Sequence, residues 1–315
     1  MSSVFATGGD SRYGYHLLNL LGSLKVNSDV FDRVVAFDLG LSAHQRELLD
    51  AVRDVDVRTV PPFSDRWAQG FTWKPWIWTH LDAGELVFWL DAGATLLRSL
   101  APALEQIRER GYFVVSQGGA LHEIVPSDYY ALYGLPRERA DGPYVAAGIV
   151  GFRVGSDFYK RVVVPTYEDC LAGRSLGFSA EEASSRNRGF QYSEELILRD
   201  AVRFRADQTV FNLRLATEFP DAYVNDLWEY GGFRSRRDHP RQVIWNHRGR
   251  GNMAYLARVP YEGTAAVRGR LFGIVYRVRW WKRMHDHLFR RSTYVLKAQK
   301  IVRELRQGPR PSAPT

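Results

Sequence analysis

The stretch ELVFWLDAG, residues 85–93, decides how the rest of the chain is interpreted. Its apolar residues, 86–90, run without polar alternation, which is typical of a strand buried on both faces of a parallel sheet. Asp91 follows at the carboxyl end, the edge of an open α/β sheet where ligands bind. Gly93 would let a ligand approach the backbone closely. The structural alternative is that Asp91 only caps a turn or the next helix.

Segments on both sides of this stretch alternate between strand and helix patterns. Strands are expected over residues 4–6, 33–37, 55–60, 86–90 and 112–116. Helices are expected over residues 13–25, 42–53, 75–81 and 101–110, with Ser42 as an N-cap and Pro75 in a first turn. This alternation predicts an α/β fold with a mostly parallel, layered sheet.

The second half of the chain is less regular. A strand of small residues, 144–152, predicts a wall that faces a ligand, and a strand over 242–245 ends just before His247. We expect this late strand to lie beside 86–90, which would bring His247 close to Asp91. Helices are expected over 158–171, 194–203 and 206–212, and a mobile polar loop over 176–189.

Composition bounds the class of protein. The chain has 315 residues, of which 45% are hydrophobic, so it can bury a large core. Its single cysteine, Cys170, excludes an intramolecular disulfide and a cysteine-based zinc site, and suits a reducing compartment. No signal peptide pattern and no run of 18 apolar residues occurs. We therefore predict a cytoplasmic protein without a membrane span.

Positive charge is concentrated at the C-terminal end. Residues 268–315 contain 13 Lys or Arg and 2 Asp or Glu, whereas residues 1–267 carry a net charge of −3. Aliphatic and aromatic residues recur at helical spacing between these basic ones, which indicates an amphipathic helix suited to an anionic membrane surface. The alternative is a helix packed on its own domain with a solvated basic face. No nucleic-acid reader motif occurs, so no nucleic-acid partner is predicted.

Four short motifs follow one another in an order that resembles nucleotide-sugar glycosyltransferases of the GT-A fold, most nearly family eight, the glycogenin-like and galactosyltransferase group. These motifs are LDAG at 90–93, AAGI at 146–149, DQTVFN at 207–212 and HRGR at 247–250. Gly93 and Thr209 stand where the family has aspartates, so the metal-binding DxD motif is degenerate. The resemblance implies a single GT-A-like, Rossmann-type domain over residues 1–262 and a basic helical extension over 263–315.

The resemblance also assigns residues to a reaction. It implies catalytic roles for Asp91, Asp207 and Gln208, and a divalent ion, Mn²⁺ or Mg²⁺, held by Asp91 and His247 with donor phosphate oxygens. The residues expected at the nucleotide are Thr7, Gly8, Asp10, Asp38, Lys74, Arg248 and Arg250. The residue types leave structural alternatives open: a solvated Lys74, a helix cap at Asp207, a turn histidine at 247, and solvated arginines.

The function implied is transfer of a sugar, in the manner of a hexosyltransferase, from a nucleotide-diphosphate sugar such as a UDP-sugar. The acceptor would be a glycan or a lipid-linked sugar in cell-envelope or capsular polysaccharide synthesis, with retention of anomeric configuration. The extension would place the enzyme on the inner face of the cell membrane. The alternative is a non-catalytic protein that binds a nucleotide sugar or glycan on the same fold. A nucleotidyltransferase is disfavoured because the first turn lacks a basic, glycine-rich triphosphate loop.

Overall fold

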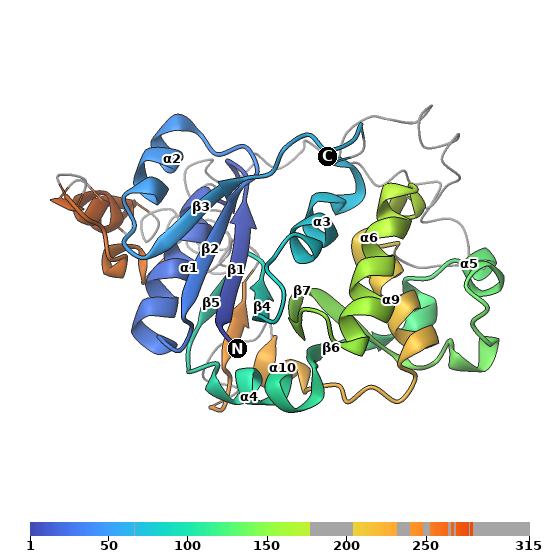
Figure 1. The fold of residues 1–315 in the computed structure, drawn as a ribbon. Coiled ribbons are helices and arrows are strands. Elements are labelled where there is room, and N and C mark those ends of the chain that lie inside the picture. The colour runs from blue at the N-terminus through green and yellow to red at the C-terminus, as the bar shows by residue number, and fades with distance from the viewer. Residues whose placement is uncertain are drawn as a thin grey trace, which may run out of the picture.

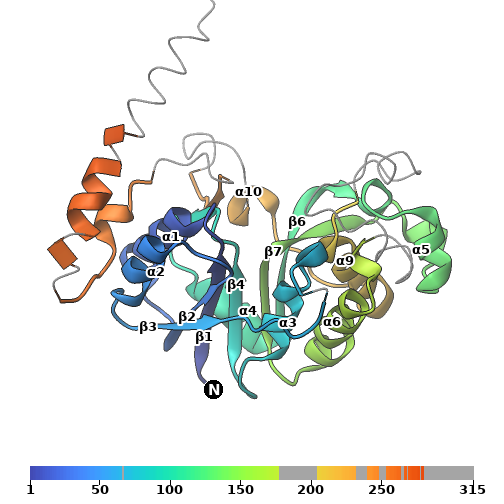
Figure 2. The same cartoon turned by 90° about the horizontal axis from the view of Figure 1, so that it is seen from above.

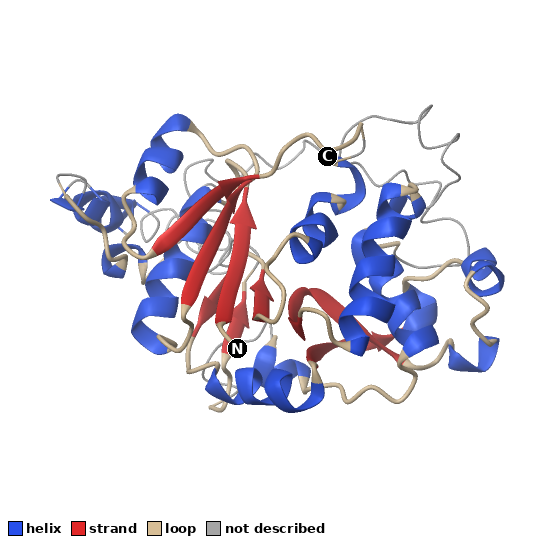
Figure 3. Cartoon of the chain, viewed as in Figure 1, coloured by secondary structure: helices blue, strands red, loops and turns tan. Residues whose placement is uncertain are grey.

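A six-stranded sheet forms the centre of the molecule (Figures 1 and 3). The computed structural model describes residues 1–65, 67–176, 204–231, 240–247, 253–263, 266–267, 269–276 and 278–279. The strands of this sheet are β1 Ser3–Gly9, β2 Arg33–Asp38, β3 Val55–Thr59, β4 Leu86–Leu90, β6 Tyr112–Ala120 and β7 Pro143–Arg153. Their order is β3-β2-β1-β4-β7-β6, and the first four are mutually parallel. The predicted fold class, α/β with a mostly parallel central sheet, is confirmed.

Helices cover both faces of the sheet. They are α1 Gly14–Asn27, α2 Ala43–Asp50, α3 Trp73–Thr79, α4 Ala101–Arg110, α5 Ser127–Leu132, α6 Val164–Leu171, α9 Asp207–Glu218 and α10 Leu227–Tyr230. A π-helical turn, Tyr159–Val163, leads into α6. The predicted N-cap of α2 is confirmed, since the Ser42 side chain accepts from the Gln45 backbone N–H in a capping box. The helix predicted over 194–203 and most of the loop over 176–189 lie outside the described residues.

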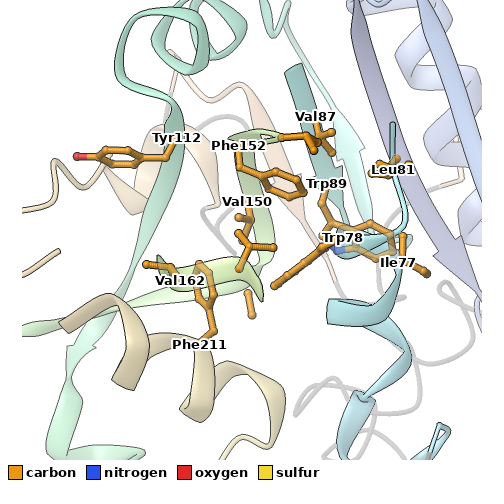
Figure 4. Packing of buried hydrophobic residues seen from close by; sticks show 14 of the residues in the cluster. Ile77, Trp78, Leu81, Val87, Trp89, Tyr112, Val150, Phe152, Val162 and Phe211 are labelled. Atoms are coloured by element: carbon orange, nitrogen blue, oxygen red, sulfur yellow. The ribbon is translucent and has the colours of Figure 1, made fainter. Parts of the chain in front are cut away.

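Strand residues alternate between two buried layers. In β1, Val4 and Ala6 face the side covered by α3, α6 and α9, whereas Phe5 faces the side covered by α1 and α4. Figure 4 shows the first layer, where Trp78 of α3 and Trp89 of β4 lie close together with their ring centroids 6.5 Å apart. Neither tryptophan has measurable solvent exposure. This packing fixes α3 against the end of β4.

Two features of the sheet differ from the prediction. Strand β7 is antiparallel to β4, and β6 is antiparallel to β7. The late strand, β8 Ile244–Asn246, pairs with a short strand that the sequence did not predict, β5 Ala94–Leu96, in a separate two-stranded sheet. The expectation that β8 lies beside β4 is therefore wrong. Apolar periodicity indicates burial but not which partner a strand pairs with.

The C-terminal extension begins packed against the domain. Residues 266–267, 269–276 and 278–279 are helical, and Figure 2 shows them beside α1 and α2. The rings of Phe272 and Tyr276 lie 4.8 and 5.1 Å from that of Tyr15. Among the described residues, no helix is long and apolar enough to cross a membrane. The rest of the predicted basic helix lies beyond the described part of the chain.

Candidate active site

A pocket of about 670 Å³ opens at the carboxyl ends of β1 and β4. One end is formed by backbone and side chains after β1 and β2, including Gly8, Asp10 and Leu39. The other end is formed by β7 and the start of α9. Its complete described lining is Gly8, Gly9, Asp10, Tyr13, Leu39, Trp67, Ala68, Phe71, Trp73, Lys74, Asp91, Ala92, Gly93, Gln117, Ala146, Ala147, Gly148, Phe204, Arg205, Asp207, Gln208 and Asn246.

A buried lysine joins two carboxylates in the middle of this pocket. Lys74 Nζ lies 3.3 Å from Asp91 Oδ1 and 3.2 Å from Asp207 Oδ2. Lys74 is only 5% exposed and Asp207 only 4%, whereas the Asp91 side chain is 42% exposed. The ammonium also lies over the rings of Phe71 and Trp73, at 5.5 and 5.7 Å from their centroids. Three elements, α3, β4 and α9, thus meet in one charged cluster.

The pKa values of Lys74 and Asp207 are both shifted, because both groups are buried and one ammonium is shared by two carboxylates. Burial alone would lower the pKa of Lys74, but Asp207 and Asp91 together outweigh it and raise that pKa. Burial raises the pKa of Asp207 to about 6, because one ammonium shared with Asp91 does not fully compensate for lost hydration. Lys74 is therefore charged at neutral pH, and Asp207 changes its protonation near pH 6.

This environment corrects one assumption about Lys74. The sequence suggested that a cation near a helix N-terminus needs a phosphate partner or a position in solvent. Lys74 is instead buried, and two protein carboxylates already match its charge. The structure therefore excludes the solvated alternative, and contact between Lys74 and a donor diphosphate stays a prediction.

Asp91 is held in place from two sides. Its Oδ1 accepts a hydrogen bond of 2.8 Å from Trp89 Nε1, and its backbone N–H donates to the Gly148 carbonyl at 2.9 Å. A Cβ added at Gly148 would lie 2.5 Å from Asp91 Oδ2. Gly148 is thus needed so that the carboxylate can lie across the middle of β7. This explains the small-residue wall that the sequence predicted.

The helix α9 is anchored to β7 by side-chain amides. Asn212 Oδ1 accepts from the Val145 N–H at 2.6 Å, and its Nδ2 donates to the Val145 carbonyl at 2.9 Å. Gln208 Nε2 donates to the same carbonyl at 2.8 Å. These bonds fix the first turn of α9, where Asp207 points toward Lys74.

Backbone strain also lies beside the charged cluster. Among described non-glycine residues, positive φ angles occur at Asp54, Phe71 and Ala206. Phe71, with φ of 57°, lines the pocket, and Ala206, with φ of 48°, directly precedes Asp207. Such conformations cost on the order of 1–3 kcal/mol and persist where surrounding structure enforces them.

His247 belongs to a different polar cluster. Its Nε2 lies 2.9 Å from the Thr95 hydroxyl, which accepts a hydrogen bond of 2.9 Å from Asn19 Nδ2. Burial, together with the neighbouring His16, lowers the pKa of His247 to about 4, so the imidazole is neutral. Its neighbour in sequence, Asn246, lines the pocket, but His247 does not.

These observations test whether Asp91 and His247 form a metal site. Both Asp91 oxygens lie near Lys74, the Nε2 of His247 is occupied by Thr95, and Gly93 offers no side chain. Among the described residues, no group of three or more His, Cys, Asp or Glu side chains is placed to hold an ion. The described residues therefore do not fit a resident divalent ion. Binding of Mn²⁺ or Mg²⁺ at this pair together with donor phosphates stays a prediction.

Other predicted nucleotide residues separate into two groups. Gly8 and Asp10 line the pocket, although Asp10 Oδ1 also accepts from the backbone N–H groups of Arg12 and Tyr13. Thr7 is fully buried and does not line it. Asp38 is also absent from the lining.

The Asp38 carboxylate closes a turn instead. It accepts from the backbone N–H groups of Gly40 and Leu41 and pairs with Arg46. Partial burial opposes ionisation, but these bonds outweigh it and lower the pKa of Asp38. These contacts give Asp38 a structural role in the turn, and its contact with the nucleotide stays a prediction. Arg248 and Arg250 lie outside the described residues, and their predicted phosphate contacts are untested.

Several lining residues were not predicted from the sequence, including Tyr13, Gln117, Arg205 and Asn246. Asn246 and Arg205 lie next to His247 and Ala206, so motif boundaries drawn one or two residues wider would have included them. Tyr13 and Gln117 carried no signal, because their positions depend on how β1 and β6 end in space.

Comparison with known proteins finds similarity only among solved structures. No family model and no curated protein matches the chain. The galactosyltransferase LgtC, solved with donor and acceptor sugar analogues, is 15% identical, with a TM-score of 0.44 over 86% of this chain and 95% of that one. The bifunctional glycosyltransferase WbbM is 14% identical, with a TM-score of 0.49 over 90% of this chain and 52% of that one. Mouse xyloside xylosyltransferase 1 is 10% identical, with a TM-score of 0.43 over 78% of this chain and 96% of that one. Likeness at this level adds nothing to the chemistry of the site, which rests on its own residues.

Proposed function

We propose that this pocket binds a nucleotide-diphosphate sugar, a UDP-sugar, and transfers its sugar to a glycan or lipid-linked acceptor. The observation that carries the proposal is Lys74, buried between the carboxylates of Asp91 and Asp207 in a pocket at the carboxyl edge of the sheet. Strained backbone conformations and desolvated, paired charges are both concentrated at functional sites. Carboxylate and ammonium groups together also match the hydroxyl groups of a sugar, which both donate and accept hydrogen bonds.

The donor would lie across the pocket from β1 toward α9. Gly8 and Gly9 present bare backbone at the β1 end, and Tyr13 and Trp67 offer aromatic faces for a base. The sugar would then reach Asp91, Asp207 and Gln208. In this orientation the diphosphate lies near Gly93, where the absence of a side chain leaves room.

The reaction follows from where charge develops. The bond from the anomeric carbon to the phosphate oxygen breaks, its electron pair stays with the diphosphate, and positive charge grows on the sugar ring. Asp91 and Asp207 would stabilise that positive charge, and Lys74 keeps both carboxylates in place. The acceptor oxygen then bonds to the anomeric carbon on the face from which the phosphate left, and its proton passes to the departing phosphate oxygen. Such a course retains configuration and needs no separate base.

A non-catalytic nucleotide-sugar-binding protein is the second candidate, favoured by the missing carboxylate at Gly93. A panel of nucleotide sugars, scored for hydrolysis and for thermal stabilisation, separates the two, because any ligand that binds the folded state raises its melting temperature. Turnover of one donor supports the transferase. Stabilisation without turnover, even with added acceptor sugars, favours the binding protein. If no nucleotide sugar is turned over and none stabilises the protein, both candidate functions are contradicted.

Asp207→Asn tests the site itself. Because the pKa of Asp207 is about 6, we expect turnover by the wild type to fall as pH drops through 6 and the carboxylate is protonated. Asp207→Asn should lose turnover by roughly 100-fold or more at pH 7.5 while keeping its fold, because it removes a charge that stabilises the transition state. Asp169→Asn is a less useful comparison because Asp169 pairs with Arg174 and Arg214 in the core, so the exposed Asp29→Asn serves as control.

We also propose that the C-terminal extension binds an anionic membrane surface, which would place the enzyme at cell-envelope or capsular polysaccharide synthesis. On its helix, five aliphatic side chains are 48–65% exposed: Val267, Leu271, Ile274, Val275 and Val278. Basic residues flank them, and residues 268–315 carry 13 Lys or Arg against 2 acidic residues. Exposed aliphatic side chains beside positive charge favour interfacial binding.

Liposome sedimentation checks this surface. The protein should sediment with phosphatidylglycerol vesicles at low salt and be released as salt rises. The Debye length shortens to about 3 Å at 1 M, so the attraction between the basic residues and the anionic lipids is screened. Leu271→Gln with Ile274→Gln should weaken binding, whereas Val26→Gln with Leu132→Gln, at similarly exposed aliphatic positions elsewhere, should not. Failure of the wild type to sediment at low salt would contradict the membrane role.

A further inference from the structure

The pocket contains one cation whose charge is not matched by a described carboxylate. Of the two described lining cations, Lys74 pairs with Asp91 and Asp207. Arg205 has no carboxylate within ion-pair distance among the described residues, and its guanidinium lies over the ring of Tyr144. An anionic ligand group entering the pocket would therefore find Arg205 available.

Arg205 is nevertheless held in a defined position. Its guanidinium lies 5.8 Å from the Tyr144 ring centroid, and Tyr144 is itself buried. Its backbone N–H donates to the Thr209 hydroxyl at 2.9 Å. The next residue, Ala206, has the strained φ of 48° that directs the chain into α9. A guanidinium placed over a ring keeps its in-plane N–H donors free for a carboxylate or phosphate.

The position of Arg205 identifies which substrate it faces. Asp91 lies between the β1 end of the pocket and β7, since its backbone bonds to Gly148. Beyond Gly148, β7 runs back through Ala146 to Val145, where α9 is anchored. Arg205 lies at this far end over the ring of Tyr144, and Gln208 bonds both Gln117 and the Val145 carbonyl there. If the nucleoside occupies the β1 end, the far end receives the acceptor.

We propose that Arg205 binds an anionic group of the acceptor, a carboxylate or a phosphate, and thereby selects acidic acceptors over neutral ones. This inference rests on the proposed transferase function for the direction of the donor. The shared chemistry is a planar or tetrahedral oxyanion that accepts two N–H donors from one guanidinium. Uronic acids and sugar phosphates both present such a group.

Binding of defined probes, measured by calorimetry with UDP present, tests the proposal without requiring turnover. The probes are methyl glucuronide, glucose 1-phosphate and, as the neutral reference, methyl glucoside. We expect at least one anionic probe to bind roughly tenfold or more tightly than the neutral one, the range for a hydrogen bond to a charged group. Tighter binding of methyl glucuronide would indicate a carboxylate on the acceptor, and tighter binding of glucose 1-phosphate would indicate a phosphate.

Variants locate the effect. Arg205→Gln should reduce the affinity for the anionic probe to that of methyl glucoside, and Arg205→Lys should keep part of the preference. Arg110→Gln is the matched control, because Arg110 lies over the Tyr223 ring at 4.8 Å but does not line the pocket. It should leave all three affinities unchanged.

Three results would overturn the proposal. The wild type could bind the anionic and neutral probes equally, or Arg205→Gln could retain the anionic preference. Arg205→Gln could instead weaken UDP itself by a similar factor, which would place Arg205 at the donor. Failure of the transferase proposal is a separate result, namely no turnover of any nucleotide sugar while Arg205 still decides which probe binds.

Discussion

Two clusters of largely buried polar side chains follow β4 and β8, and only one of them lines the pocket. Lys74, Asp91 and Asp207 form a charged cluster that lines it. Asn19, Thr95 and His247 form a neutral cluster whose members are joined by hydrogen bonds and do not line the pocket. The difference shows that burial of polar groups does not by itself mark a site. The charged cluster differs in two ways. One ammonium is shared by two carboxylates, and these side chains line the pocket, where a ligand can contact them.

The largest expected effect is on the charged cluster, through Lys74→Met. Removing the ammonium leaves two carboxylates without their counter-charge, which should lower the free energy of unfolding by about 3–5 kcal/mol. Urea unfolding at pH 7.5 measures this. Lys25→Met, which breaks an exposed pair with Asp29, is the control and should cost less than about 1 kcal/mol.

The same variant should recover at lower pH. The pKa of Asp207 is already raised to about 6, and losing Lys74 can only raise it further, so Asp207 takes up a proton as pH falls from 7.5 to 5. The stability difference between Lys74→Met and the wild type should therefore shrink over that interval. A difference that is constant between pH 7.5 and 5 would show that Asp207 is not coupled to Lys74.

The next largest effect is expected from Gly148→Ala, which keeps every charge but displaces one. The added methyl group would meet Asp91 Oδ2 at 2.5 Å, so the carboxylate must move away from its present position. We expect nucleotide-sugar affinity to fall, and the free energy of unfolding to fall by about 1–3 kcal/mol, the usual cost of overpacking. Gly9→Ala also lies in the pocket but meets only ordinary contacts of 3.5 Å or more, and should have the smaller effect. Equal effects of both variants would contradict the role of Gly148.

A smaller effect is expected in the neutral cluster, from Thr95→Val. This change removes the hydroxyl that joins Asn19 to His247 and should lower the free energy of unfolding by about 1–2 kcal/mol. Affinity for nucleotide sugars should not change. Thr166→Val is the control, because that buried hydroxyl only bonds a carbonyl of its own helical segment. A loss of donor affinity with Thr95→Val would remove the distinction between the two clusters.

The neutral cluster also has its own pH dependence. Burial lowers the pKa of His16 and of His247 to about 4, below the ordinary value of 6.5. The unfolded chain therefore binds more protons between these values, so stability should be lost as pH falls from about 6.5 to 4. Replacing both histidines with glutamine should flatten this part of the curve, and an unchanged slope in thermal unfolding would contradict the assignment.

The smallest effect is expected for the binding of Mn²⁺ in the absence of a nucleotide. Because Asp91 is already bound to Lys74 and Trp89, calorimetry should detect weak or no Mn²⁺ binding to the wild type without nucleotide. Gly93→Asp adds a carboxylate near Asp91 and should increase that affinity by roughly tenfold or more, since carboxylates are good ligands for this ion. Tight binding to the wild type without nucleotide would contradict this description of the pocket. Turnover in excess chelator tests separately whether an ion that arrives with the donor takes part.

The sequence by itself determined the elements whose residues act locally. The apolar run of 86–90 and the alternation before it are sufficient for the parallel strands, and Ser42 and Gln45 for the start of α2. Asp91 could be selected because it follows a recognisable strand, whereas Asp207 and Gln208 could be selected only through the resemblance of the motif at 207–212 to a known family. Periodicity and capping depend on neighbours in sequence, so they can be seen without a structure.

Only the tertiary structure decided which of these residues meet. Lys74 and Asp207 are far apart in sequence, and their ion pair depends on how α3 and α9 pack against β4 and β7. The pairing of β8 with β5 moved His247 into a network with Thr95, although its motif suggested a place beside Asp91. Arg205 is a candidate only because the described residues place no carboxylate within ion-pair distance of it, and its guanidinium lies over the Tyr144 ring. Long-range pairing and charge balance are properties of the packed chain, and no local pattern of residues specifies them.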